Sequence, residues 1–391
     1  MILLTLFLLG DLYWHLGNRV SPAAVILQSG WVALTSGAYS AVGPLLLPSS
    51  SGQVLSLSFR DGEPLATPAS GRSTSMPGIG RLTIFHESGH RLAVLSQASR
   101  VNLASTSQDG KVQVFSDFNA SNLYIVGPTG AEAAPLLSGD EAGISRSAIM
   151  QQAAARKAAG TLPPGWHLIW ATSPVVSPDG SYVLYLSSRG DPFGSNGPEL
   201  WRLDLATGSD RELVPASAAP AMTPLGFSPQ GFVVGAGNGD VYVINPSDGS
   251  TNVLFHNVDV VALSPTGNSL AYVQAQSGQE RLMITNLATT RTFNVPLPRF
   301  TRFSGQAAFS PDGTKIALLT LGRSGQTELT TATLSNAGVL RETTLPAPSG
   351  QALVLDLEPT WVDGDHVAVV TRANGQLRTW TLDLRAGPRT T

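Results

Sequence analysis

The sequence contains no cysteine. This excludes disulfides, thiolate metal sites, cysteine nucleophiles and a lipid anchor attached through cysteine. It has only three lysines, Lys111, Lys157 and Lys315, so arginine supplies most of the positive charge. The formal net charge is −3, and this near balance gives no electrostatic case for nucleic-acid binding. Charged residues make up 13% of the chain, a low value that suits sheets with Ser and Thr on their exposed faces.

The apolar run at the N-terminus, Met1 to Leu9, is too short to span a bilayer, which needs roughly 20 residues. It has the apolar core of a secretory signal but lacks the basic region that normally precedes one. We interpret residues 1–20 as a signal or membrane anchor, with Tyr13 and Trp14 at the interface. The alternative is a terminal strand or helix packed on the domain. The first interpretation predicts an extracytoplasmic protein, which is secreted, periplasmic or associated with a membrane.

A short turn motif recurs between apolar runs. In Ser177-Pro178-Asp179-Gly180 the proline suits the second position of a type I turn, and the glycine suits a position where φ is positive. Related motifs occupy the positions from Ser228, Ser264, Ser310 and Val362, at successive steps of 51, 36, 46 and 52 residues. Their mean, about 46, is typical of four-stranded propeller blades.

These repeats predict an all-β protein, a β-propeller of seven four-stranded blades, although six or eight would also fit. Residues 21–391 would form one domain. A strand from the N-terminal region, such as Ala24 to Gln28, could complete the last blade. A helix is expected at Glu141 to Ala159, within an insertion at residues 139–163, with Asp140 capping its start and Gly160 its end.

The N-terminal half is less regular. We expect a hairpin at 81–85 and 91–95, with 123–126 and 134–137 as the third and fourth strands of the same blade. An extra hairpin at 101–106 and 112–115 would then decorate that blade.

The units resemble the WD-like propeller repeats of the TolB type, also found in the propeller domains of prolyl-oligopeptidase-type peptidases. The matching segments are Ser177 to Gly180, Ser310 to Gly313, and Glu199 to Gly208. In such families the propeller is an interaction platform or a gate in front of a hydrolase. The chain has no G-x-S-x-G motif and no α/β segment after the repeats, so the hydrolase of those peptidases is not expected.

Three patterns suggest chemistry but fit turns better. His86-Glu87-Ser88-Gly89-His90 matches a zinc motif that works only on a helix, and here it lies between two apolar runs. Gly235 to Asp240 resembles a nucleotide loop, yet Asn238-Gly239 is a favoured hairpin turn. The loop Asp191 to Asn196 lacks the regular spacing of a calcium site. No metal or cofactor is therefore predicted.

Aromatic and arginine residues in loops are candidate anchors for a partner, because these types carry much of the binding energy at interfaces. The candidates are Trp166, His167, Arg189, Phe193, Arg299, Phe300 and Arg302. Packing inside the propeller is the alternative for each of them. The sequence thus favours a non-catalytic scaffold for protein–protein interaction. The alternative is a propeller that binds a small ligand or glycan, or a lyase or hydrolase with its site at the mouth of the central channel.

Overall fold

The computed structural model describes residues 19–20, 31–33, 39–46, 54–58, 71–76, 80–87, 90–96, 101–107, 112–117, 121–126, 133–276, 279–295, 302–321, 325–335, 338–355, 359–361, 364–373 and 376–385. The expected signal segment, apart from Arg19 and Val20, lies outside these residues. Among the described residues the one helix is α2 (Arg146–Ala158), and it is too short and too polar to cross a membrane.

The described strands form seven sheets of four or more strands, numbered here in chain order. Sheet 1 contains β1 (Arg19–Val20), β3 (Tyr39–Leu46), β4 (Val54–Ser58), β7 (His90–Ser96), β6 (Gly80–Glu87) and β5 (Gly71–Met76). Sheet 2 contains β8 (Val101–Thr106), β9 (Gln113–Asp117), β10 (Leu123–Val126) and β11 (Ala133–Pro135). Sheet 3 contains β14 (Thr172–Val176), β15 (Tyr182–Ser187), β16 (Glu199–Asp204) and β17 (Asp210–Val214).

The remaining sheets complete the set. Sheet 4 contains β18 (Thr223–Ser228), β19 (Gly231–Gly235), β20 (Val241–Ile244) and β21 (Thr251–Phe255). Sheet 5 contains β22 (Asp259–Leu263), β23 (Ser269–Gln276), β24 (Gln279–Asn286) and β25 (Thr292–Asn294). Sheet 6 contains β26 (Arg302–Phe309), β27 (Lys315–Leu321), β28 (Thr327–Ser335) and β29 (Gly338–Pro346). Sheet 7 contains β2 (Trp31–Ala33), β33 (Gln376–Asp383), β32 (His366–Ala373), β30 (Ala352–Leu353) and β31 (Thr360–Trp361).

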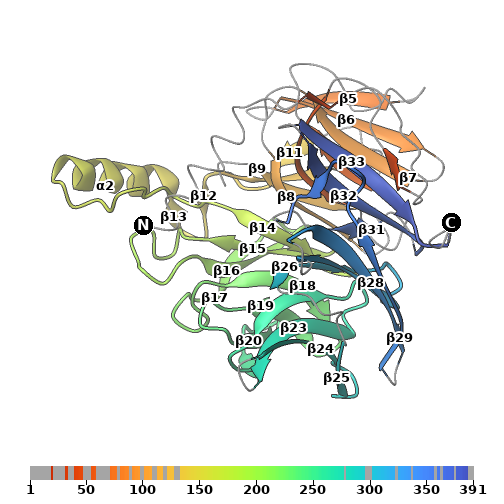
Figure 1. Ribbon diagram of the computed structural model, residues 1–391. Coiled ribbons are helices and arrows are strands. Elements are labelled where there is room, and N and C mark those ends of the chain that lie inside the picture. The colour runs from red at the N-terminus through yellow and green to blue at the C-terminus, as the bar shows by residue number, and fades with distance from the viewer. Residues whose placement is uncertain are drawn as a thin grey trace.

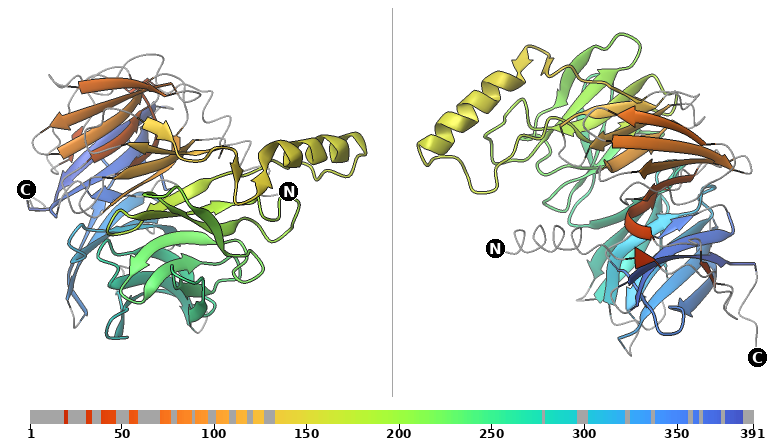
Figure 2. Two further views of the ribbon diagram at one scale, coloured as in Figure 1. Left: turned by 180° about the vertical axis from the view of Figure 1, so that it is seen from behind. Right: turned by 90° about the horizontal axis from the view of Figure 1, so that it is seen from above.

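Successive sheets contact one another and the last returns to the first (Figures 1 and 2). Strand β11 contacts β5, β14 lies against β8 and β9, β18 contacts both β14 and β22, and β26 contacts both β22 and β31. Strand β33 then contacts β1 and β3 of sheet 1. All neighbouring strands within these sheets are antiparallel except β4 and β7 of sheet 1, which are parallel. This circular arrangement of small sheets is a β-propeller, and the predicted fold class is confirmed. Seven remains the predicted number of blades.

An N-terminal strand completes the last sheet, as predicted. Strand β2 pairs antiparallel with β33, with Trp31 opposite Leu382 and Ala33 opposite Trp380. The segment proposed for this role, Ala24 to Gln28, lies outside the described residues.

The recurring turns owe their shape to a buried serine. The Ser177 hydroxyl accepts hydrogen bonds from the backbone N–H of Ser181 (3.0 Å) and Tyr182 (3.1 Å), and it donates to Asp179 Oδ1 (2.6 Å). The Gly180 amide donates to the Ser177 carbonyl at 2.9 Å, and Gly180 has a φ of 72°, which glycine adopts at little cost. Ser264 and Ser310 are buried in the same way at the equivalent turns of sheets 5 and 6.

The hydrophobic core consists of separate clusters, each shared by two adjacent sheets. Val114 and Leu123 of sheet 2, for example, pack with Tyr185 and Trp201 of sheet 3. Such sheets cannot bury both faces alone, so each is stabilised by its two neighbours.

The predicted assignment of the second blade was wrong. Strands β8 to β11 form their own four-stranded sheet, while β6 and β7 belong to sheet 1. The proposed extra hairpin is therefore the first half of a blade. The turn between β8 and β9, Ser107-Gln108-Asp109-Gly110, has glutamine where the later motif has proline, but it keeps the buried serine, whose hydroxyl accepts from the Val112 amide at 3.0 Å. The error arose because, without the proline, this turn was not recognised as a repeat of the motif.

Candidate interaction surface

An arm projects from the propeller between sheets 2 and 3. It comprises residues 138–171, with the hairpin β12 (Asp140–Glu141) and β13 (Ile144–Ser145), helix α2, and a segment that returns to β14. Figure 1 shows α2 standing away from the sheets, with its C-terminal end outermost. The helix predicted in this insertion is present, although it begins at Arg146 rather than near Glu141.

The N-terminal cap of α2 differs from the prediction. Ser145, not Asp140, is the N-cap, and its hydroxyl accepts from the Ala148 amide at 3.4 Å. Asp140 instead belongs to the preceding hairpin, where Oδ1 accepts from the Arg146 amide at 3.0 Å. Gly160 follows the helix with a φ of 68°, so the predicted glycine stop is confirmed.

Most of α2 is exposed. Only Ile149 and Ala153, one turn apart, are buried, and Ile149 packs into the cluster between sheets 2 and 3. A helix of this length is marginal in water by itself, so the rest of the arm must hold it in place.

The returning segment of the arm packs on the loop at 188–198. The rings of Trp166 and Phe193 stack with centroids 5.3 Å apart, and the Trp166 indole N–H donates to the Pro192 carbonyl at 2.7 Å. The guanidinium of Arg156, in the last turn of α2, lies 4.0 Å from the centre of the Phe193 ring. These contacts tie the outer end of the helix back to sheet 3.

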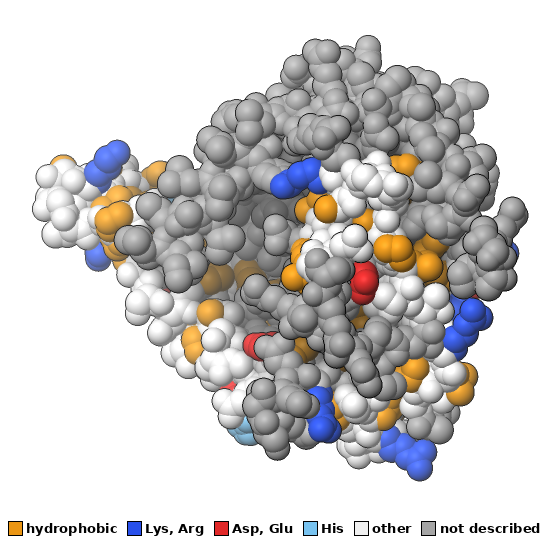
Figure 3. All heavy atoms as spheres, viewed as in Figure 1, with side chains coloured by type: hydrophobic (Ala, Val, Ile, Leu, Met, Phe, Trp, Pro, Cys, Tyr) orange, Lys and Arg blue, Asp and Glu red, His pale blue; other side chains and the backbone are white. Residues whose placement is uncertain are grey.

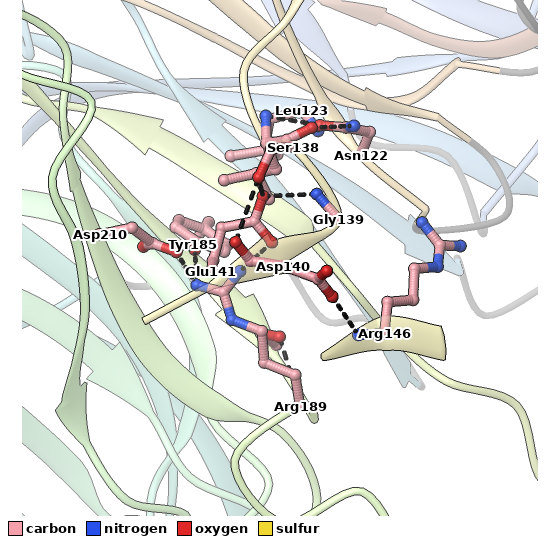
Figure 4. Close-up of polar contacts among 12 residues, drawn as sticks. Asn122, Leu123, Ser138, Gly139, Asp140, Glu141, Arg146, Tyr185, Arg189 and Asp210 are labelled. Atoms are coloured by element: carbon pink, nitrogen blue, oxygen red, sulfur yellow. Dashed lines mark hydrogen bonds and ion pairs between the residues drawn. The ribbon is translucent and has the colours of Figure 1, made fainter. Parts of the chain in front are cut away.

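A buried ionic network holds the base of the arm (Figure 4). Arg189, 1% exposed, pairs with Asp210 of β17 and with Glu141 of the arm, the latter at 3.4 Å between Nη1 and Oε2. Its guanidinium also donates to the Tyr185 hydroxyl, which in turn donates to Asp210 at 2.7 Å. The Trp201 ring lies 3.9 Å from the guanidinium carbon. Arg189 thus bridges a sheet and the arm.

Glu141 is itself fully engaged. Its second carboxylate oxygen accepts from the Ser138 hydroxyl at 2.9 Å and from the Gly139 amide at 2.7 Å. The hairpin is therefore fixed on both sides of the ion pair. Removing Arg189 from this buried set would leave two carboxylates without a cation, at high cost.

The network perturbs two ionisable groups. Burial raises the pKa of the Asp210 carboxyl above its ordinary value, although Arg189 acts in the opposite direction. Burial also raises the pKa of the Tyr185 phenol, and Asp210 adds to that shift. Both directions favour the neutral form, which is the usual consequence of removing a group from water.

The arm shares one end of the sheets with several loops, here called the insertion face. Backbone hydrogen bonds join each of these loops to the next. The amides of Ala221, Gly237 and Val258 donate to the carbonyls of Asn196 (3.0 Å), Pro220 (3.2 Å) and Gly239 (2.8 Å), respectively. On this face the Asp240 carboxylate meets Nδ1 of His256 at 3.0 Å, and this contact lowers the pKa of Asp240.

The structure brings some of the sequence-predicted residues together. Trp166 and Phe193 stack, and Arg189 lies inside the protein near them rather than at the surface. His167 is exposed, with Nδ1 3.3 Å from the Gly165 carbonyl. Arg302 begins β26, at the insertion face, and the neighbouring Arg299 and Phe300 lie outside the described residues. That any of these candidate residues binds a partner stays a prediction.

Sequence reasoning missed the residues that hold Arg189, namely Glu141, Tyr185 and Asp210. One signal was available for the tyrosine, because Tyr185 and Tyr272 both follow the motif serine by eight residues. The carboxylates gave no such signal, since their meeting depends on how the arm folds back.

The weighed chemical motifs lie in turns. Residues His86 and Glu87 end β6, His90 begins β7, and Glu87 is opposite His90 in the hairpin. Gly239, with a φ of 82°, lies in the turn between β19 and β20. The hairpin interpretation of Gly235 to Asp240 is confirmed, but the turn runs from Ala236 to Gly239, so its central pair is Gly237-Asn238 rather than Asn238-Gly239. Strands β6 and β7 form the hairpin predicted for the other motif, and Ser88 and Gly89 lie outside the described residues.

No protein-family model and no curated protein matches the sequence. Among solved structures, oligogalacturonate lyase from Vibrio parahaemolyticus is similar with a TM-score of 0.55 and 14% identity, covering 94% of this chain and 98% of that one. The β-propeller domain of the trilobed protease from Pyrococcus furiosus gives 0.50 and 13%, covering 83% and 93%. TolB from Acinetobacter baumannii gives 0.43 and 17%, covering 71% of this chain and 63%, less than two thirds, of that one. The chain is therefore a β-propeller that carries a helical arm on one face.

Proposed function

We propose that this propeller is a non-catalytic scaffold that binds another protein through its arm. The observation that carries the proposal is that α2 is held firmly at its base yet exposes nearly all of its surface. Burying Arg189 with two carboxylates is costly compared with apolar packing, and such arrangements are often kept for specificity of structure. Here the network fixes where the arm points.

An extracytoplasmic location accompanies this proposal. The apolar segment Met1 to Leu9 and the resemblance of the repeats to the TolB type support it. Fractionation of cells that express the full chain tests it, with the chain expected outside the cytoplasm or with membranes. Recovery in the cytosolic fraction alone would count against this location.

Site-specific cross-linking tests the arm. A photo-reactive residue at Gln151, exposed on α2, should form an adduct with a protein in cell-envelope fractions. The same residue at Leu340, which is 69% exposed on β29, is the matched control and should form none. The adduct should weaken when Arg189→Met releases the base of the arm. A chain that gives no adduct from Gln151 does not use its arm for protein binding.

A site for a small ligand on the insertion face is the second candidate. The Asp240–His256 contact favours it, because Asn238 and Tyr242 also donate to the same carboxylate, at 2.9 Å and 3.3 Å. The similar propeller from Vibrio parahaemolyticus is a lyase that acts on oligogalacturonate, so this sugar is a reasonable first probe. Turnover or binding of oligogalacturonate that is lost with Asp240→Asn would favour the ligand site over the scaffold.

A further inference from the structure

One flank of α2 carries apolar and basic side chains together. Arg146, Met150 and Lys157 are separated by four and seven residues, so they lie on the same side of the helix. Met150 is 48% exposed and is one of three large hydrophobic residues exposed in the described part of the chain. Methionine is flexible and polarisable, which suits it to filling a pocket on a partner. Figure 3 shows basic and hydrophobic side chains together on this protrusion.

The two acidic residues of the arm, Asp140 and Glu141, both lie at its base, so the positive charge is concentrated on α2. No Asp or Glu occurs from Ala142 to Pro178, whereas Arg146, Arg156 and Lys157 all lie on α2. Arg146 donates to the Ser121 carbonyl at 2.9 Å, and Arg156 covers Phe193, so both have structural roles. Lys157 is exposed near the outer end of the helix. A basic residue there also offsets the helix dipole, which is its simplest structural role.

We propose that this flank of α2 binds an acidic protein surface that has an apolar pocket for Met150. The inference rests on the proposed scaffold function and adds the chemistry of the partner. Charge complementarity decides the occupant. A second copy of this chain, packed α2 against α2, would bring Lys157 and Arg146 of both copies together as like charges. A lipid surface is disfavoured because the exposed face, with Gln151, Gln152 and Ala154, offers little apolar area to insert.

The test uses the full chain and defined probes. The first probe is a synthetic amphipathic helix with glutamates around a leucine pair, and the second is its lysine counterpart. Fluorescence anisotropy should detect binding of the acidic peptide alone, weakening as salt is raised because exposed charges are screened. Lys157→Glu should weaken it at least about fivefold by placing like charges together. Met150→Ser should weaken it about tenfold through loss of a buried side chain. Leu340→Ser is the matched control and should change nothing.

Any of the following results would overturn the proposal. The acidic peptide could bind no better than its lysine counterpart, or equally well to the Lys157→Glu variant. Phosphatidylglycerol vesicles, rather than the peptide, could bind and lose affinity with Met150→Ser, which would assign the flank to lipid. Sedimentation could show a dimer that Met150→Ser dissociates, which would assign it to a second copy. If the yield of the protein adduct from Gln151 is unchanged by Lys157→Glu, the scaffold function stands and only the acidic partner is rejected.

Discussion

Sheets 3 and 5 place a tyrosine at the same point and surround it with different chemistry. In sheet 5 the Tyr272 hydroxyl meets Thr285 at 3.2 Å, and Thr285 meets Thr292 at 2.7 Å, so a ladder of neutral hydroxyls crosses the sheet. In sheet 3 the hydroxyl of Tyr185 donates to Asp210 and accepts from Arg189. The same repeat thus carries a neutral ladder in one blade and an ionic network in the other.

The difference follows from what each blade supports. In sheet 5, β23 runs straight into β24, with Gln276 opposite Gln279 across a tight hairpin. In sheet 3 the equivalent connection is the loop at 188–198, which supplies Arg189 to the base of the arm and Phe193 to its outer end. The comparison teaches that charge is buried where a projecting element has to be oriented, and that hydroxyls suffice elsewhere.

Replacing Arg189 should have the largest effect. Arg189→Met leaves Glu141 and Asp210 buried without a cation, and we expect a loss of about 3–5 kcal/mol in the free energy of unfolding. Urea denaturation measures it. Adding Glu141→Leu and Asp210→Leu should recover most of that loss, because apolar packing replaces the whole set. If the Arg189→Met variant has the same free energy of unfolding as the unaltered chain, the network does not stabilise the arm.

The two tyrosines give a direct comparison. Tyr185→Phe removes a hydrogen bond to a buried carboxylate and should cost about 1.5–3 kcal/mol, whereas Tyr272→Phe removes one between hydroxyls and should cost about 0.5–1.5 kcal/mol. Both values come from the same denaturation experiment. Equal losses in the free energy of unfolding would mean that the charges in sheet 3 do not strengthen the hydrogen bonds of Tyr185.

The aromatic stack should matter less for stability than for the order of the arm. Trp166→Ala removes the contact with Phe193, worth about 0.5–1.5 kcal/mol beyond area burial. Amide hydrogen exchange should then accelerate in α2 and stay unchanged in sheet 5. Val253→Ala, at an exposed position of β21, serves as the control. Unchanged exchange in α2 would show that the network alone orders the arm.

The pH dependence should give the smallest effect. Because the pKa of Asp210 is raised when folded, the folded state binds this proton more tightly, and the free energy of unfolding should fall as pH rises from about 3.8 through the folded pKa. Asp210→Asn should flatten that slope. Asp179 is the counterpart in the turn of the same sheet. The Ser177 hydroxyl lowers its pKa, so stability should be lost as pH falls below 3.8. Slopes of the same sign at both positions would contradict this comparison.

Most of the fold could be predicted from the sequence because a recognisable turn marks each later blade. Ser177 and Ser310 fix tight turns through local hydrogen bonds, and such bonds leave a signature in consecutive residues. The blade of β8 to β11 was divided wrongly although its first turn contains the same buried serine, Ser107, because glutamine stands where the later turns have proline. In the candidate site, Trp166 and Phe193 were found by residue type. The role of Arg189 was not, since Glu141 and Asp210 lie 48 and 21 residues away and meet it only in the folded protein.

The pairing of β2 with β33 has a consequence for how the protein is made. Trp31 leaves the ribosome before the intervening sheets, and its partner Leu382 is synthesised only after them. Loop-closure entropy makes contacts of such long range slow to form. Before β2 and β33 pair, the outer edge of β33 and strand β2 both offer unpaired backbone groups to other chains. The ring of sheets therefore stays open until β2 and β33 pair, and chaperone binding or misassembly would occur during this interval.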